Sequence, residues 1–222
     1  MLSKKAINWF ALAAGVLMLV EVALSIFVPW WKLQIGSGTG FVTVNANPFY
    51  TNFGVLRLNF VIPILFAINV ATTALFTASG IIFIIYSVKP VKSYSKHLLS
   101  YGWKRPVYTL VGFIVVLMLI VYVAPDIVNT MAHTSMIHIP LVGSSVMQIS
   151  SNVFGNSNSV QIGITVIATF EYTFYLAIAA TALGIAARIY HRRIVSKAVI
   201  SPPAAVITPI QAPTPAPASQ PI

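Results

Sequence analysis

Apolar residues dominate four long stretches of the chain, which are separated by more polar segments. The stretches run from about 6 to 28, 60 to 86, 107 to 124 and 162 to 189. A helix needs about 20 residues to cross a hydrocarbon core about 30 Å thick. The pattern therefore predicts an all-α membrane protein with four transmembrane helices, of which the third is the shortest.

The first stretch has an alternative interpretation as a signal peptide, because Lys4 and Lys5 precede it. Its apolar part is longer than the roughly 7–15 residues of a signal sequence, and no A-x-A-like cleavage site follows. We interpret it as a retained helix, ending near Pro29, Trp30 and Trp31.

The two loops on one side of these helices have a β-like pattern. In the loop 30–59, the alternating run WKLQI is followed by GSGTG and then by FVTV, which predicts a hairpin. In the loop 125–161, the runs 136–142 and 146–149 flank Gly143-Ser144-Ser145 in a weaker version of the pattern. We expect the two loops to form a small β-rich extracytoplasmic element, with two irregular polar loops as the alternative.

Basic residues determine the predicted orientation. The chain has 13 Lys and Arg against 3 Asp and Glu, a formal net charge of +10. Eleven of the basic residues lie on one side of the predicted helices: Lys4, Lys5, Lys89, Lys92, Lys96, Lys104, Arg105, Arg188, Arg192, Arg193 and Lys197. Lys32 and Arg57 lie on the other side. The positive-inside rule places both termini in the cytoplasm of a plasma-membrane protein. Charges at helix ends are explained by topology, so we expect no nucleic-acid partner.

Four tryptophans lie near the ends of the predicted helices. Trp9 and Trp103 fit the inner aromatic belt of a membrane protein, and Trp30 and Trp31 fit the outer belt. We expect all four to be interfacial anchors.

Two cytoplasmic segments have distinct compositions. The loop 87–105 places apolar residues between lysines, which is typical either of a short helix on the membrane surface or of a solvated basic loop. The last 22 residues, 201–222, include seven prolines and no charge. We expect a four-helix transmembrane domain over 1–200 and a disordered Pro-rich tail over 201–222.

The second and fourth stretches end alike, as TASGIIFIIY (77–86) and TALGIAARIY (181–190). This similarity suggests a repeated unit of helix, hairpin and helix. Apolar helices can also share residues by chance. With or without a repeat, close helix packing would be allowed by four small residues: Ala78, Gly80, Ala182 and Gly184.

The chain has only three acidic residues, and two of them, Glu21 and Glu171, fall within predicted helices at a similar depth. Asn69 lies at a comparable depth, so the three predict an intramembrane polar layer. Ionisable groups in a membrane are costly and point to function by default. The layer is either a proton or cation site, with a proton shared between carboxylates, or a hydrogen-bonded layer that fixes the helix register.

Other chemistry is weakly indicated. Asp126, His133 and His138 in the second loop are weak metal candidates, and their spacing matches no known ligand motif. The chain has no cysteine and no nucleophile-elbow, phosphate-loop or HExxH pattern. We therefore expect neither a cofactor nor an enzyme activity.

The layout of four helices, cytoplasmic termini and a β-rich first outer loop resembles that of claudin and peripheral-myelin tetraspan proteins. Those proteins carry a W-x-G-L-W-type stretch and paired cysteines in that loop. Here only Trp30 and Trp31 correspond, and the cysteines are absent. The resemblance is therefore limited to layout and assigns no residue a role.

These features favour a structural or accessory subunit of a larger membrane assembly, with the lipid bilayer, other membrane subunits or a second copy as partners. The alternative is a small proton- or cation-coupled transporter or channel that uses Glu21 and Glu171. A metal-dependent membrane enzyme using the outer histidines is a third and weaker hypothesis.

Overall fold

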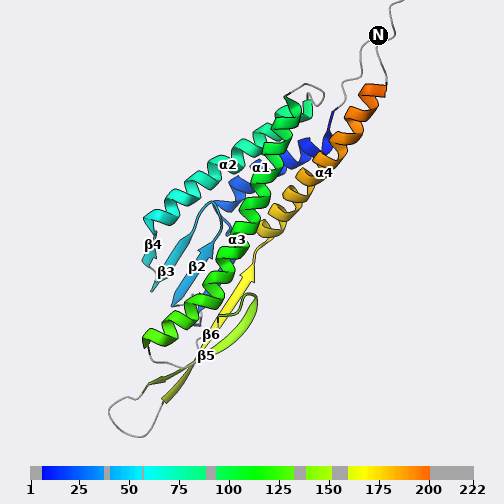
Figure 1. Ribbon diagram of the computed structural model, residues 1–222. Coiled ribbons are helices and arrows are strands. Elements are labelled where there is room, and N and C mark those ends of the chain that lie inside the picture. Colours follow the sequence, from blue (N-terminus) through cyan, green and yellow to red (C-terminus); the bar gives the residue numbers. More distant parts are fainter. Residues whose placement is uncertain are drawn as a thin grey trace, which may run out of the picture.

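A computed structural model describes residues 7–37, 41–56, 58–88, 94–132, 139–151 and 160–200 (Figure 1). The predicted tail 201–222 lies outside these residues, as do His133 and His138. The described chain forms four helices and one antiparallel sheet.

The helices are α1 (Trp9–Ser25), α2 (Pro63–Val88), α3 (Ser95–Ala132) and α4 (Tyr172–Ile200). α1 and α3 each pack against both α2 and α4, so the four helices form a closed bundle (Figure 1). Three helices contain a segment long and apolar enough to cross a membrane, and they suggest a membrane protein: Pro63–Val88, Ser95–Val123 and Tyr172–His191. α1 is also apolar but has 17 residues.

The bundle core follows a repeat of alternating three- and four-residue steps. On α1 the buried positions in this repeat are Ala11, Ala14, Met18, Glu21 and Ser25. On α4 the buried positions in the same repeat are Thr173, Ala177, Ala180, Gly184 and Ala187. A spacing of 3.5 residues keeps one stripe of each helix facing its neighbour. Because these stripes consist mostly of small residues, α1 and α4 can approach closely.

α1 and α2 meet at a pair of glycines. A Cβ atom on Gly15 would lie 2.7 Å from the carbonyl oxygen of Gly80, and a Cβ on Gly80 would lie 3.1 Å from the carbonyl oxygen of Gly15. Neither position therefore has room for a larger residue without moving the backbone. Gly184 on α4 similarly faces the ring of Phe83 on α2.

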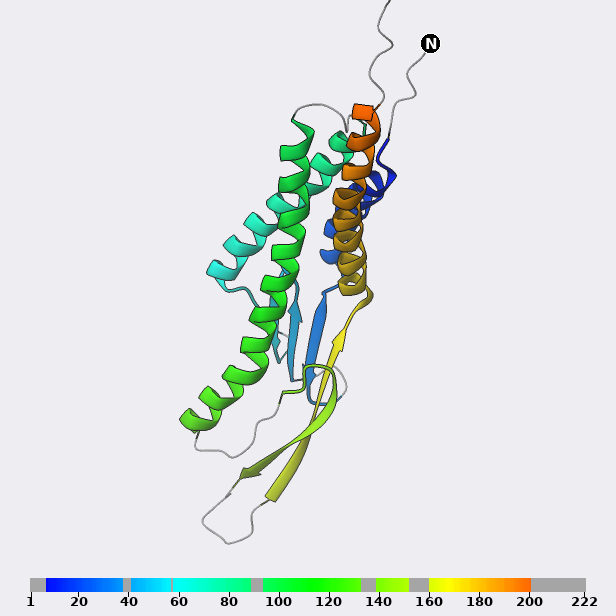
Figure 2. The ribbon, with the colours of Figure 1, turned by 45° about the vertical axis from the view of Figure 1, so that its right-hand side comes forward.

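The strands are β1 (Trp31–Ile35), β2 (Val42–Ala46), β3 (Asn52–Val55), β4 (Leu58–Phe60), β5 (Gly143–Ser151) and β6 (Val160–Phe170). Their order in the sheet is β4-β3-β2-β1-β6-β5, and every pair is antiparallel. The sheet lies beyond the ends of α1 and α4, while α3 runs alongside both the bundle and the sheet (Figure 2).

Alternation along β1 determines which face of the sheet is covered. Trp31 and Leu33 are buried in a cluster with Leu117 and Val121 of α3, whereas Lys32 between them is half-buried. Residue Trp31 pairs with Ala46 and Ile35 pairs with Val42, so the hairpin predicted from the WKLQI and FVTV runs forms. Gly36 starts its turn at a φ of +105°, a conformation that glycine adopts without a Cβ clash.

The prediction for the fourth apolar stretch is wrong at its start. Residues 162–170 belong to β6, and α4 begins only at Tyr172. β6 alternates Ile164, Val166 and Ala168 with Thr165 and Ile167, and β-branched residues favour a strand when a partner strand is available. β6 pairs on both sides, with β1 and with β5.

The predicted β-rich element of the two loops is also corrected. The sheet is a separate six-stranded layer that includes residues predicted to lie within the second and fourth helices. No turn forms at Gly143-Ser144-Ser145, because these residues begin β5, which pairs with β6 instead.

Further boundaries differ from the prediction, including the end of α3, at Ala132 rather than near 124, and the end of α4, at Ile200 rather than near 189. α1 ends at Ser25 rather than near 28, and Phe60 belongs to β4 rather than to α2. α3 begins at Ser95, so the second half of the predicted loop 87–105 is a continuous part of the helix that was predicted over 107–124.

We expect Gly15→Ala to lower the free energy of unfolding by about 1–3 kcal/mol, because the added methyl overpacks the contact with Gly80. Gly112→Ala is the matched control, since a Cβ there meets no atom within 4 Å. Thermal unfolding in detergent, followed by circular dichroism, compares the two variants. Equal melting temperatures would contradict the close α1–α2 contact.

Candidate functional site

A buried hydrogen-bonded cluster lies where the helix bundle meets the sheet. The Oε1 atom of Glu21 accepts hydrogen bonds from the Ser25 hydroxyl, at 2.8 Å, and from the indole Nε1 of Trp30, at 2.6 Å. Trp30 Nε1 also lies 3.1 Å from Ser25 Oγ. All three side chains are buried. The Oε2 atom of Glu21 has no hydrogen-bond partner among the described residues.

Trp30 links this cluster to every helix of the bundle except α2. Its ring makes edge contacts with Phe113 of α3 and Phe174 of α4, with centroid distances of 5.1 and 5.9 Å. A third edge contact, at 5.6 Å, is with Phe49, whose ring in turn contacts Phe76 of α2. The indole therefore packs in an aromatic cluster while its N–H is bound to Glu21.

The backbone of Trp30 joins the sheet. Its N–H donates to the carbonyl of Ala46, the last residue of β2, at 3.1 Å. Its carbonyl accepts from the N–H of Glu171, the residue between β6 and α4, at 3.0 Å. Thr173 Oγ1 donates to the neighbouring carbonyl of Pro29 at 2.8 Å. The ends of β2 and β6 are thus tied to the segment that leaves α1.

Asn47 supports the same junction. Its Nδ2 donates to the carbonyl of Ser25 at 2.8 Å, which satisfies one of the free carbonyls at the end of α1. Its Oδ1 accepts from the N–H groups of Phe49 and Tyr50 at 2.8 and 2.6 Å. This is an Asx-type turn, in which a short polar side chain organises the next residues.

The structure gives the three residues of the predicted polar layer separate surroundings. Glu21 is bound to Ser25 and Trp30, as described. Asn69 is buried against the segment 47–51 that contains this Asx-type turn, called the 47–51 turn below. When the Asn69 amide is oriented so that both its groups are satisfied, its Nδ2 donates to the Pro48 carbonyl at 3.3 Å and its Oδ1 accepts from the Thr51 N–H at 2.8 Å. Glu171 is half-buried and lies between β6 and α4, one residue before α4 begins. The two glutamates are connected through Trp30. The Glu21 carboxyl accepts a hydrogen bond from the Trp30 indole, and the backbone N–H of Glu171 donates to the Trp30 carbonyl.

Of the four tryptophans predicted to be interfacial, two are at least partly exposed and two are buried. Trp9 is 67% exposed, whereas Trp30 and Trp31 are fully buried and so take part in packing. Trp31 Nε1 donates to the carbonyl of Leu141 at 2.8 Å. Trp103 is half-buried, with the guanidinium of Arg188 over its ring at 4.5 Å.

The predicted helix-packing residues are also only partly brought together. Gly80 and Gly184 are buried at helix contacts, Ala78 is half-buried and Ala182 is exposed. Ala177, Ala180 and Ala187, which form the α4 stripe with Gly184, were not identified from the sequence. The alternating three- and four-residue spacing of small residues is the signal that identifies this stripe.

The metal candidates are not assembled into a site in the described part of the chain. Asp126 lies in α3, and His133 and His138 are outside the described residues. Among the described residues, no three His, Cys, Asp or Glu side chains lie close enough together to hold a metal ion.

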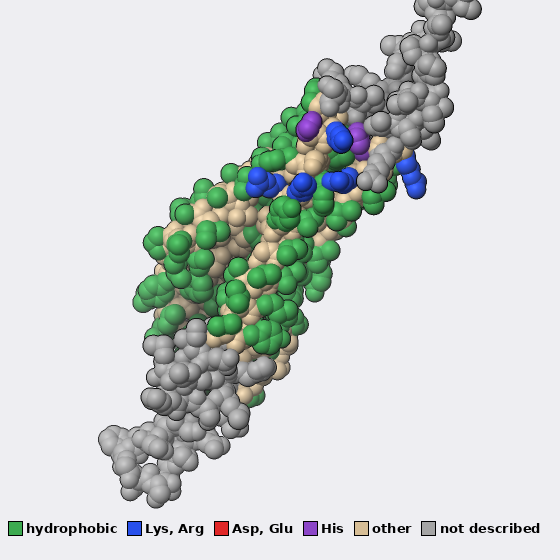
Figure 3. Space-filling model, viewed as in Figure 1, with side chains coloured by type: hydrophobic (Ala, Val, Ile, Leu, Met, Phe, Trp, Pro, Cys, Tyr) green, Lys and Arg blue, Asp and Glu red, His purple; other side chains and the backbone are tan. Residues whose placement is uncertain are grey.

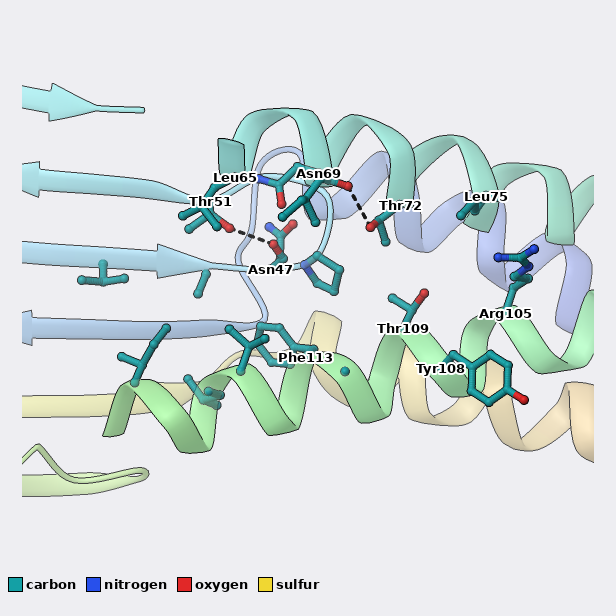
Figure 4. Close-up of a pocket in the computed structure, with 18 of the residues that line it drawn as sticks. Asn47, Thr51, Leu65, Asn69, Thr72, Leu75, Arg105, Tyr108, Thr109 and Phe113 are labelled. Carbon is teal, nitrogen blue, oxygen red and sulfur yellow. Dashed lines mark hydrogen bonds between the residues drawn. The ribbon is translucent and has the colours of Figure 1, made fainter. Parts of the chain in front are cut away.

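A cavity of about 420 Å³ lies between α2, α3 and the 47–51 turn (Figure 4). We call it the α2–α3 cavity. It has an apolar wall formed by Val44, Ala46, Pro48, Phe53, Leu65, Ile68, Leu75, Gly112, Phe113, Val116, Leu117 and Ile120. Its polar lining residues are Asn47, Thr51, Asn69, Thr72, Arg105, Tyr108 and Thr109. Its volume is in the range of roughly 300–1,000 Å³ that is typical of small-molecule sites.

Comparison with known proteins adds no family assignment. No protein-family model matches the chain, and no curated protein matches it in sequence.

We expect Glu21→Leu to lower the free energy of unfolding by about 1–3 kcal/mol, because the buried N–H of Trp30 loses its closest acceptor. Glu21→Gln should cost less, since an amide oxygen can accept from both Ser25 and Trp30. Chemical unfolding in detergent, followed by circular dichroism, gives the free energies.

A double-mutant cycle with Trp30→Phe isolates this interaction. In the Trp30→Phe background, Glu21→Leu should cost clearly less than in the wild type, because the indole donor is already absent. The same cost in both backgrounds would show that the Glu21–Trp30 hydrogen bond does not stabilise the fold.

Proposed function

We propose that this protein is a multi-pass plasma-membrane protein that acts as a structural or accessory subunit of a larger membrane assembly. In this proposal all four helices lie in the bilayer and both termini are cytoplasmic. The long apolar helices support the membrane placement. The described Lys and Arg side chains of α3 and α4 support the orientation, since they gather toward the end of the bundle that is far from the sheet (Figure 3).

The observation that carries the accessory role is an exposed apolar surface at the edge of the sheet. All three residues of β4 are exposed, with Leu58 at 64% and Phe60 at 51%. Exposed apolar side chains continue on both sides of the strand. We call this set the β4 surface: Val55, Leu56, Leu58, Phe60, Val61, Ile62 and Ile64.

Exposure of the β4 surface is unfavourable both in water and in lipid. A contiguous apolar patch of this kind is unfavourable in water and marks an interaction site. β4 is also an edge strand, so one side of its backbone has no strand partner within the described sheet. Unpaired N–H and C=O groups are costly in hydrocarbon. A neighbouring protein satisfies both requirements, because it can cover the side chains and pair with the edge.

The transporter alternative receives less support from the geometry. It needs Glu21 and Glu171 to act together in one layer. Glu21 Oε1 is engaged by Ser25 and Trp30, and Glu171 lies between β6 and α4, at the sheet end of the bundle. The contacts of Glu21 and Trp30 are those of a structural junction.

We expect the wild-type protein to co-purify with at least one other membrane protein in near-equal amount, after extraction of native membranes with a mild detergent. Leu58→Asp should reduce the recovered partner roughly tenfold, because a charge at a desolvated contact costs at least about 1.4 kcal/mol of binding. Quantitative mass spectrometry of the purified samples measures the ratio of partner to bait.

Val146→Asp is the matched control, since Val146 lies on the opposite edge strand, β5, and is 65% exposed. This variant should retain the partner. A wild-type protein that purifies as a lone monomer would contradict the accessory role. Equal loss in the two variants would contradict the assignment of the contact to β4.

A further inference from the structure

We propose that the α2–α3 cavity binds one anionic phospholipid, with its phosphate at Arg105 and a hydrocarbon chain along the apolar wall. The proposal rests on the membrane placement given above but is independent of any partner at the β4 surface. The cavity, its opening and its charge each support it.

The first support is the shape of the cavity. Its lining on α3 extends from Arg105 to Ile120, which is 15 residues or about 22 Å of helix. On α2 it extends from Leu65 to Leu75, or about 15 Å. Half of a hydrocarbon core is also about 15 Å deep. The cavity is therefore long enough for the chain of a lipid in one leaflet.

The second support is that the cavity is open at the side of the bundle. A Cβ atom on Gly112 would meet nothing within 4 Å. Ile68 on α2 and Val116 on α3 line the cavity and are both more than half exposed. In the proposed placement this side of the bundle faces lipid, so a chain can enter from the bilayer without passing through the protein.

The third support is the charge at one end. Arg105 reaches from α3 toward α2 near Leu75, at the end of the cavity away from the strands (Figure 4). Its guanidinium lies 4.9 Å from the ring centroid of Tyr101 on the same helix. The remaining polar groups that line the cavity are uncharged amides and hydroxyls.

None of the three acidic residues, all of which lie in the described part of the chain, is placed to neutralise Arg105. The chain has only three acidic residues. Glu21 is bound to Ser25 and Trp30, and Glu171 lies at the sheet end of α4. Asp126 lies 21 residues further along the same helix, or about 31 Å away. The half-buried guanidinium facing the apolar cavity therefore has no anionic partner among the described residues, and an anion from outside the chain would supply the missing charge.

A phosphate group meets this need. Arginine binds phosphate through paired charge-assisted hydrogen bonds, which are stronger than those between neutral groups. In the proposed orientation Arg105 lies toward the cytoplasmic leaflet, where anionic lipids are available. A zwitterionic lipid also carries a phosphate, but its added cation would lie beside the guanidinium and weaken the attraction. The site should therefore select for net negative charge.

Native mass spectrometry of the full-length protein in detergent, titrated with phosphatidylglycerol or with phosphatidylcholine, tests the proposal. The wild type should bind one phosphatidylglycerol about tenfold more tightly than phosphatidylcholine, which corresponds to one charge-assisted contact. Arg105→Gln should abolish this preference, and Arg105→Lys should retain most of it. Gly112→Phe should prevent binding of both lipids by filling the cavity.

Two neighbouring substitutions control for charge and bulk. Lys104→Gln removes the adjacent positive charge, and Val111→Phe adds an aromatic ring at an exposed position; neither residue lines the cavity. Both variants should bind lipid like the wild type. Melting temperatures measured without added lipid confirm that Arg105→Gln and Gly112→Phe are folded.

Three results would overturn the proposal. Equal loss of binding in Lys104→Gln and Arg105→Gln would indicate adsorption to a basic surface. Unchanged binding in folded Gly112→Phe would place the lipid elsewhere. Loss of a dimer or of a co-purified protein in Gly112→Phe would identify the occupant as another helix. If Leu58→Asp retains its co-purified partner and lipid binding is normal, the proposed contact at the β4 surface is rejected but the lipid site is not.

Discussion

The hydrogen bond from the Trp30 indole to Glu21 is the interaction on which the arrangement of bundle and sheet depends. It joins a side chain at a core position of α1 to the residue directly before β1. The indole ring is enclosed by aromatic side chains from the 47–51 turn, α3 and α4, while the Trp30 backbone pairs with the ends of β2 and β6. One residue therefore fixes the direction in which the chain leaves α1 and the position at which the sheet begins.

This junction explains why a chain with so few acidic residues has one in its core. A buried carboxyl is costly, but a buried indole N–H without an acceptor is costly too. Glu21 supplies one acceptor atom for both Trp30 and Ser25, and Asn47 similarly satisfies the carbonyl at the end of α1. Away from the junction the bundle packs through small residues, such as Gly15 against Gly80, which need no polar contacts. The far end of the bundle has buried polar contacts of its own, because Asn8 Nδ2 donates to the Tyr86 hydroxyl at 3.2 Å and to the carbonyl of Ala187 at 3.1 Å.

The sequence predicted the helices well because a long apolar run has few alternatives, and it predicted the β1–β2 hairpin because alternation and a Gly-rich turn agree. It failed at 162–170, where an apolar run rich in β-branched residues was interpreted as helix. The β-branched residues were a local signal for a strand, but the run continues into the apolar helix without a break, and the pairing with β1 and β5 that settles the strand is not visible in the sequence. The equal depth predicted for Glu21 and Glu171 depended on the same boundary error. Trp30 was predicted at a membrane interface because an indole, with its large apolar ring and one N–H group, suits both a membrane interface and a protein interior that offers an acceptor. The sequence alone does not distinguish these two environments.

Hydrogen–deuterium exchange of the Trp30→Phe variant, compared with the wild type in the same detergent, tests the role of the junction most directly. The substitution keeps an aromatic ring but removes the indole donor. If the junction holds the sheet to the bundle, exchange should become faster at the amide of Glu171 and along β1 and β6, as well as in the last turn of α1. Faster exchange confined to that last turn, with unchanged protection of β1 and β6, would contradict the account.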